Sequence, residues 1–242
     1  MLIHAAVKSL YQPIKAHLWY VYAYLGIMIV LPYISMIARG MNRKLENRFI
    51  LLWLFFSGAS YVLRHLLLLR QWDISVDNPI PIVQGTYYLG YFIAGHIIYK
   101  RLHGKVRESK RTRLYVLGYL FSILVLIFGT YAISLNQGYY YEFAYGYRNL
   151  FTITASCFLF AGIAGREESL REGSKKILDK LSKASLGVYL VHLIFLELLQ
   201  KNIMLMNFHP LAGIPILVLV VFVFSYISVY LMQKVPIIQK FV

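Results

Sequence analysis

Three residues near the C-terminal end of the chain have the types and the spacing that suit proton transfer along one helix. The stretch "SKASLGVYLVHLIFLELL" contains Ser185, Tyr189 and His192 at positions i, i+4 and i+7. At 3.6 residues per turn these side chains project along one face of a helix, and Gly187 lies on the opposite face. Imidazole accepts and returns a proton near neutral pH, and hydroxyl groups can stabilise an oxyanion. The stretch therefore predicts an apolar helix with one face suited to acid–base chemistry.

The same residues also suit a structural role. Polar groups in hydrocarbon are costly unless they pair or line a cavity, so Tyr189 and His192 can act simply as hydrogen-bond partners of neighbouring helices. A glycine such as Gly187 allows a neighbouring helix to approach closely. The residue types alone leave both interpretations open.

The composition of the chain places this helix in a membrane. Of the 242 residues, 59% are hydrophobic and 14% are charged, and the mean hydropathy is +0.60. A soluble domain of this length is far less apolar. A span needs about 20 mainly apolar residues, and the predicted spans are Leu18–Ala38, Phe49–Leu69, Thr86–Tyr99, Leu114–Leu135, Leu150–Gly165, Ala184–Leu199 and Leu211–Met232. We therefore predict an all-α fold, a polytopic membrane bundle of about seven transmembrane helices that forms a single domain over residues 1–242.

Positive charge alternates between the connections and predicts the orientation. Lys and Arg number four between the first and second spans, seven between the third and fourth and six between the fifth and sixth, whereas each alternate connection carries one. Because loops rich in Lys and Arg stay on the cytoplasmic side, we expect the C-terminus in the cytoplasm and the N-terminus outside. The net charge of +15 is mostly such an orientation signal, so no nucleic-acid partner is expected. Cys157 is the single cysteine, which excludes an internal disulfide, and no metal site is expected.

Other polar residues at the ends of spans are weaker candidates. His17 opens the first span beside Trp19, where an aromatic belt at the membrane interface explains the residues equally well. Arg64, in the outer part of the second span, and Arg148, at the outer start of the fifth, can hold a sugar or the charged part of a donor, or can form structural ion pairs. For His96, in the third span, a hydrogen bond to a neighbouring helix is the expected role, and a catalytic role is the weaker alternative.

Three stretches resemble membrane-bound acyltransferase family 3, the bacterial O-acyltransferases of cell-surface polysaccharides. "SLGVYLVH", from Ser185 to His192, is similar to an S-x-G-[IV]-Y-x-x-H element of that family. "AHLWYVYAYLGIMIVLPYI", from Ala16, resembles the opening of a span that ends near a proline. "YYLGYFIAGHIIYK", from Tyr87, is similar to an aromatic and glycine-rich span that leads into a basic loop. The order and spacing of the three stretches also fit the family.

The resemblance implies a function and a set of residues. It implies transfer of an acyl group, most simply acetyl, from acyl-CoA to a hydroxyl of a cell-surface polysaccharide or glycolipid in the bacterial inner membrane, with no permanently bound cofactor. The expected catalytic residues are His192, Tyr189 and His17, and the expected substrate-binding residues are Ser185, Arg64, Arg148 and Trp19. A carrier or exporter of lipid-linked glycans, without acyltransferase activity, is the alternative.

The resemblance also implies helices that this chain lacks. Family members are expected to have about ten spans, and their favoured catalytic histidine follows an arginine by some ten residues in the first span. In the segment before Ala16 the only histidine is His4, and no arginine precedes it. The chain is therefore expected to resemble the C-terminal part of the family, without the first three or so transmembrane helices, and to be inactive alone. An N-terminal fragment that supplies those helices is a candidate partner. The acyl group, the acceptor, the donor and the oligomeric state stay open.

Overall fold

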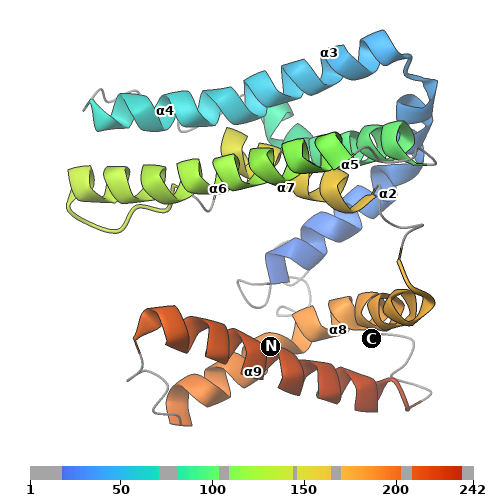
Figure 1. Ribbon diagram of the computed structural model, residues 1–242, viewed down its shortest axis with the longest axis vertical. Helices are drawn as coiled ribbons and strands as arrows, with labels where there is room; N and C mark the ends of the chain where they lie inside the picture. The colour runs from blue at the N-terminus through green and yellow to red at the C-terminus, as the bar shows by residue number, and fades with distance from the viewer. Residues whose placement is uncertain are drawn as a thin grey trace, which may run out of the picture. The chain divides into compact units, whose positions relative to one another are not determined.

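Helices make up most of the part of the chain that the structure describes. A computed structural model describes residues 18–70, 81–103, 109–143, 146–164, 170–202 and 209–235. Its helices are α2 (Trp19–Gly40), α3 (Arg43–Trp53), the π-helical turn η2 (Leu54–Ala59), α4 (Ser60–Leu69), α5 (Pro81–Leu102), α6 (Ser109–Gln137), α7 (Leu150–Ala164), α8 (Glu172–Asn202) and α9 (Pro210–Met232) (Figure 1). The prediction of an all-α fold is confirmed for these residues. They form two compact units, α2 to α7 and α8 with α9.

The predicted spans correspond to helical segments of the described chain. Five segments are long and apolar enough to cross a membrane: Tyr20–Gly40, Arg43–Leu67, Arg111–Gln137, Glu172–Leu199 and Ala212–Met232. A sixth, α7, is apolar but shorter, as the sequence predicted. The seventh, α5, has 22 residues and ends in a basic turn with Lys100 and Arg101. These lengths and compositions are those of a multi-pass helical membrane protein.

Several helices are longer than the predicted spans, and α5 and α8 extend furthest beyond them. The third span was expected to begin at Thr86, but α5 begins at Pro81, and proline is favoured in the first turn of a helix. The sixth span is the apolar part of α8, which begins at Glu172. In this polar beginning, Lys175 pairs with Glu172 at 2.9 Å and Lys183 with Asp179 at 2.7 Å. Such exposed pairs stabilise a helix only modestly, yet they suit helical turns outside hydrocarbon.

The second span changes its helical geometry halfway. Figure 1 shows α3 and α4 as one continuous helix, and η2 joins them. In this turn the amide of Ser60 bonds to the carbonyl of Phe55, five residues earlier. Ser57 and Gly58 are buried, and a Cβ atom at Gly58 would lie 3.0 Å from the Cα atom of Leu150 in α7. The extra residue in the turn changes the register of the helix, so it decides which faces of α3 and α4 are buried.

One of the two buried clusters described in the first unit lies where α3, α5 and α7 meet. Trp53, Ala94 and Ile153 form a buried cluster. The indole of Trp53 fills the space beside Gly90, where a Cβ atom would overlap the ring. Its ring also makes an edge-to-face contact with Tyr91, with 5.0 Å between the ring centres. A glycine at position 90 therefore lets α5 accept the largest side chain of this core.

The helices α6 and α7 pack along each other in the same unit. A hydrogen bond of 3.0 Å joins the hydroxyl groups of Ser122 and Thr154. Gly118 makes room for the ring of Phe158, because a Cβ atom there would lie 2.7 Å from it. Small residues and hydroxyl pairs of this kind are typical of contacts between helices in membranes.

A buried carboxylate joins the start of α3 to the end of α5. Glu46 is 3% exposed. Its Oε1 atom accepts from Lys100 Nζ at 2.8 Å, and its Oε2 atom accepts from Arg101 Nη2 at 2.8 Å. The side chain of Asn47 accepts a further bond from Arg101. Lys100 and Arg101, which the charge pattern explained only as orientation signals, therefore also hold α5 to α3.

The second unit is a pair of packed helices, α8 and α9. The rings of Phe195 and Phe224 stack across the pair, with 6.0 Å between their centres. Val221, Ser225 and Val229 are buried on one face of α9, at intervals of four residues. The hydroxyl of Ser225 donates to the carbonyl of Val221, which satisfies it inside its own helix.

Candidate functional site

Tyr189 and His192 lie together on α8, as the sequence predicted. Their ring centres are 5.5 Å apart, and His192 Nδ1 is 2.5 Å from the backbone carbonyl of Tyr189. Because a carbonyl can only accept, Nδ1 carries the proton in this bond and Nε2 keeps its lone pair. Both side chains are partly buried. The arrangement fixes the imidazole in a tautomer that can accept a proton through Nε2.

Ser185 shares this face of α8, but its hydroxyl turns back to its own helix. It donates to the carbonyl of Ser182 at 2.7 Å, and the residue is exposed. Ala184 and Gly187, on the other side of the helix, are buried, in agreement with the predicted close approach of a neighbour at Gly187. The described contacts therefore join Tyr189 to His192 and leave Ser185 one turn away from them.

Arg64 and Arg148 both lie near Tyr61 and His65 in the first unit. The guanidinium carbon of Arg148 lies 6.0 Å from the ring centre of Tyr61. Both arginines interact electrostatically with Tyr61 and with His65. Two residues that the sequence placed in different spans, 84 positions apart by their numbers, thus belong to one cluster. The cluster offers positive charge beside aromatic rings, a combination that suits an anionic or sugar-like group.

His65 is the buried centre of this cluster. It is 6% exposed, and its Nδ1 atom donates to the carbonyl of Tyr61 at 2.7 Å. Its ring lies 4.2 Å from the ring centre of Tyr61 and makes edge-to-face contacts with Tyr141 and Phe143. The sequence pointed to Arg64 but not to its neighbour His65 as a site residue. A histidine beside an arginine inside a span is the signal that could have identified it.

Asn149 holds the connection that carries Arg148. It is fully buried; its side-chain nitrogen donates to the carbonyl of Phe143 at 3.0 Å, and its oxygen accepts from the amide of Phe151 at 3.0 Å. The second bond caps the start of α7, as asparagine does at helix N-termini. Sequence reasoning missed this residue, although an asparagine directly before an apolar run is a recognisable cap signal.

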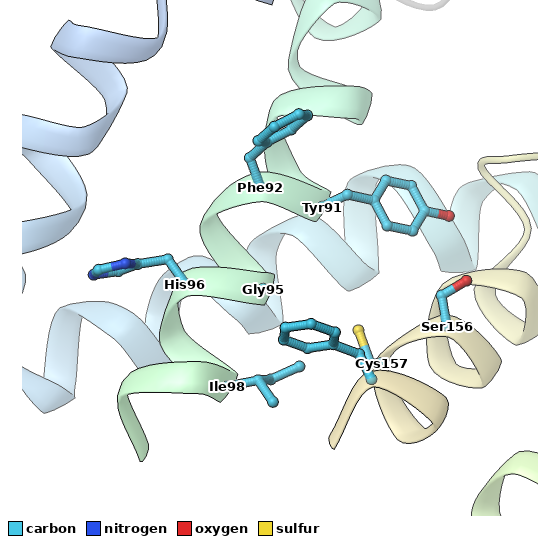
Figure 2. Close-up of a pocket in the computed structure, with 8 residues that line it drawn as sticks. Tyr91, Phe92, Gly95, His96, Ile98, Ser156 and Cys157 are labelled. Carbon is cyan, nitrogen blue, oxygen red and sulfur yellow. The ribbon is translucent and has the colours of Figure 1, made fainter. Parts of the chain in front are cut away.

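A groove of about 350 Å³ lies between α5 and α7. Figure 2 shows Gly95 between two sets of side chains, with Phe92 and His96 on one side and Tyr91, Ser156 and Cys157 on the other. The remaining lining residues are Ile98 and Phe160. The expected hydrogen bond of His96 to a neighbouring helix is absent at Nε2, which is buried without a partner among the described residues. No pattern in the sequence predicts this groove.

Two predicted site residues are not placed by the structure. His17 lies outside the described residues. Trp19 is the first residue of α2, and its side chain lies outside the described part of the chain. Tyr189 and His192, here called the α8 pair, belong to a different compact unit from the cluster around His65. The distances given for each group are therefore distances within its own unit.

Comparison with known proteins gives one match. The acyltransferase 3 family model, described as an acyltransferase domain, matches residues 4–230. No curated protein and no solved structure matches the chain. The match runs through every helix from α2 to α8 and most of α9. This multi-pass membrane protein therefore belongs to the acyltransferase 3 family.

Proposed function

We propose that the protein transfers an acyl group, most simply acetyl, from acyl-CoA to a hydroxyl of a cell-surface polysaccharide or glycolipid. The membership of the family supports acyl transfer as the reaction class. The single observation that carries the assignment to residues is the bond between His192 Nδ1 and the carbonyl of Tyr189. It leaves the lone pair of the imidazole on Nε2, where a general base needs it.

In the proposed reaction, His192 removes the proton of the acceptor hydroxyl as its oxygen attacks the thioester carbonyl. The tetrahedral oxyanion then collapses, the carbon–sulfur bond breaks, and the leaving thiolate takes the proton back from His192. The products are an ester and free CoA thiol. The hydroxyl of Tyr189 is the proposed donor to the oxyanion, since a preorganised donor stabilises such charge.

The other predicted residues have binding roles in this proposal. Arg64 and Arg148 hold a charged or polar part of a substrate beside the ring of Tyr61, where their cluster offers positive charge. Ser185 and Trp19 contact the acceptor, and His17 is a second candidate base. Membrane lipid surrounds the bundle. The proposed location is the bacterial inner membrane, with the C-terminus in the cytoplasm, and a fragment that supplies further helices is a proposed partner.

The proposal is tested by expression in a bacterial host that lacks its own surface O-acyltransferase. One arm contains this chain alone, and a second adds a three-span N-terminal segment from another family member. Acyl groups on the surface glycan are then measured by mass spectrometry. Acylation in either arm supports the function, provided that His192→Ala removes it. Normal protein levels without acylation in both arms contradict it, and export of unmodified glycan in that case points to the carrier alternative.

A further inference from the structure

The groove between α5 and α7 presents hydrocarbon to a ligand, although hydroxyl groups line part of it. The hydroxyl of Tyr91 donates to the carbonyl of Tyr147 at 2.5 Å. The hydroxyl of Ser156 donates to the carbonyl of Thr152 at 2.9 Å. Both donors are thus used inside the protein. Besides the His96 ring and the Cys157 thiol, the groove offers the aromatic and aliphatic surface of Phe92, Ile98 and Phe160.

The size and place of the groove suit one hydrocarbon chain. Its volume of about 350 Å³ lies at the lower end of the range of about 300–1,000 Å³ that ligand sites occupy. Gly95 forms its middle, and a Cβ atom added there would meet nothing within 4 Å. Because α5 and α7 are apolar helices of a membrane protein, the acyl chains of lipids are the apolar ligand present at this depth.

Excess positive charge lies on α5 one helical turn beyond the groove-lining residue His96. Lys100 follows His96 by four residues, so it lies one turn further along the same side of α5. Lys100 and Arg101 share the single carboxylate of Glu46, which leaves a net charge of one. The side chain of Lys100 is 47% exposed. A negative group beside Lys100 would therefore meet an accessible cation one helical turn beyond the lining of the groove.

We propose that this groove binds one acyl chain of an anionic phospholipid, with its phosphate beside Lys100. The inference goes beyond acyl transfer and does not depend on it, because the groove is defined by α5 and α7 and not by the α8 pair. The apolar lining selects a hydrocarbon chain. The charge of Lys100 selects an anionic headgroup over a zwitterionic one.

The test uses the full chain in lipid nanodiscs with photoactivatable phospholipids whose diazirine lies in the acyl chain. Phosphatidylglycerol and phosphatidylcholine probes are compared, and crosslinked peptides are mapped by mass spectrometry. We expect crosslinks at Ile98 and Phe160, with about a fivefold preference for phosphatidylglycerol, the factor that one basic side chain contributes near an anionic lipid. Lys100→Gln, which keeps a donor for Glu46, should remove the preference.

A variant that fills the groove checks the location. Gly95→Leu should reduce crosslinking at Ile98 and Phe160 at least severalfold, whereas Gly26→Leu should not, since a Cβ atom at Gly26 also meets nothing within 4 Å. Equal labelling by both probes in the wild type overturns the proposal. So does unchanged labelling in Gly95→Leu, or displacement of the phospholipid by long-chain acyl-CoA, which would make the groove a donor site. The wild-type and Lys100→Gln results decide the matter even where Gly95→Leu fails to fold.

Discussion

Arg101 holds Glu46 through two nitrogens of its guanidinium group. Its Nε and Nη2 atoms lie 3.1 and 2.8 Å from Glu46 Oε2, and the carboxylate side chain is only 4% exposed. The contact spans 55 positions of the sequence and fixes the end of α5 against the start of α3. The groove and the buried cluster around Trp53 both include residues of α5. By fixing the end of α5, the contact between Arg101 and Glu46 supports both.

Removal of the two cations should destabilise the protein more than removal of the carboxylate. The double variant Lys100→Met with Arg101→Met leaves Glu46 buried without a cation, a change that typically costs about 3–5 kcal/mol. Glu46→Gln leaves two partly exposed cations that water can solvate, so its cost should be smaller. Thermal unfolding in detergent measures both. Equal or reversed losses would show that the carboxylate is not effectively buried.

The fit of Trp53 beside Gly90 predicts a strong effect of a single methyl group. Gly90→Ala should lower the yield of monodisperse protein sharply, because a Cβ atom there overlaps the indole and overpacking typically costs about 1–3 kcal/mol or more. Gly95→Ala is the matched control on the same helix, where space is open. Trp53→Leu in the Gly90→Ala background should recover yield. Size-exclusion chromatography in detergent gives the measurement, and equal yields for the two glycine variants would refute the packing.

The sequence predicted the helices well because each span must satisfy its own backbone hydrogen bonds in hydrocarbon. Length and hydropathy therefore located α2 and α9 with little error. The beginnings of α6 and α8 were less accurate, since their first turns are polar and lie outside the apolar run. The predicted third span left out the proline-led first turn of α5. No periodicity predicts the π-helical turn η2, because one inserted residue changes the register without changing the composition.

The site was predictable where it is local to one helix. Tyr189 and His192 are three residues apart, so helical geometry alone places their rings together. Arg148 lies near Tyr61, in the same helix as Arg64, only because α4 packs against the connection before α7. A single sequence does not show which distant residues pack in this way. Glu46 and its two cations are a second example: charge counting explains the basic residues but does not identify their partner.

Labelling of introduced cysteines tests the predicted orientation. In a Cys157→Ser background, Ser109→Cys and Ser174→Cys should be protected from an impermeant thiol reagent in intact cells, because both lie in the basic connections. Gln137→Cys, at the other end of α6, should react. Permeabilised cells supply the control for accessibility. Reaction of Ser109→Cys from outside would overturn the orientation.

Loss of the Asn149 side chain should loosen the connection that carries Arg148. Asn149→Ala leaves the amide of Phe151 without its side-chain acceptor, at about 1–3 kcal/mol for an unsatisfied buried group, and leaves the carbonyl of Phe143 with only the bond from the Tyr61 hydroxyl among the described contacts. Asn149→Asp keeps the acceptor for Phe151 and tests which bond matters. Proteolysis of the connection in detergent reports the effect. An Asn149→Ala protein as resistant as the wild type would contradict the assigned role.

Variants of Tyr189 and His192 distinguish most clearly between a catalytic role and a packing role for these residues. His192→Ala removes the proposed base and should reduce the rate of acyl transfer by about 10²–10⁴, with membrane abundance near normal. Tyr189→Phe keeps the backbone carbonyl that holds His192 Nδ1 but removes the hydroxyl, so it should cost about 10²–10³ as a lost oxyanion donor. Ser182→Ala, one turn before Ser185, is the control, since only the carbonyl of Ser182 makes the described contact. The measurement is ester content of surface glycan against the amount of protein, in whichever arm of the expression test is active. Should His192→Ala and Tyr189→Phe acylate as fast as the wild type, both residues serve packing, and the base must be sought elsewhere in the chain.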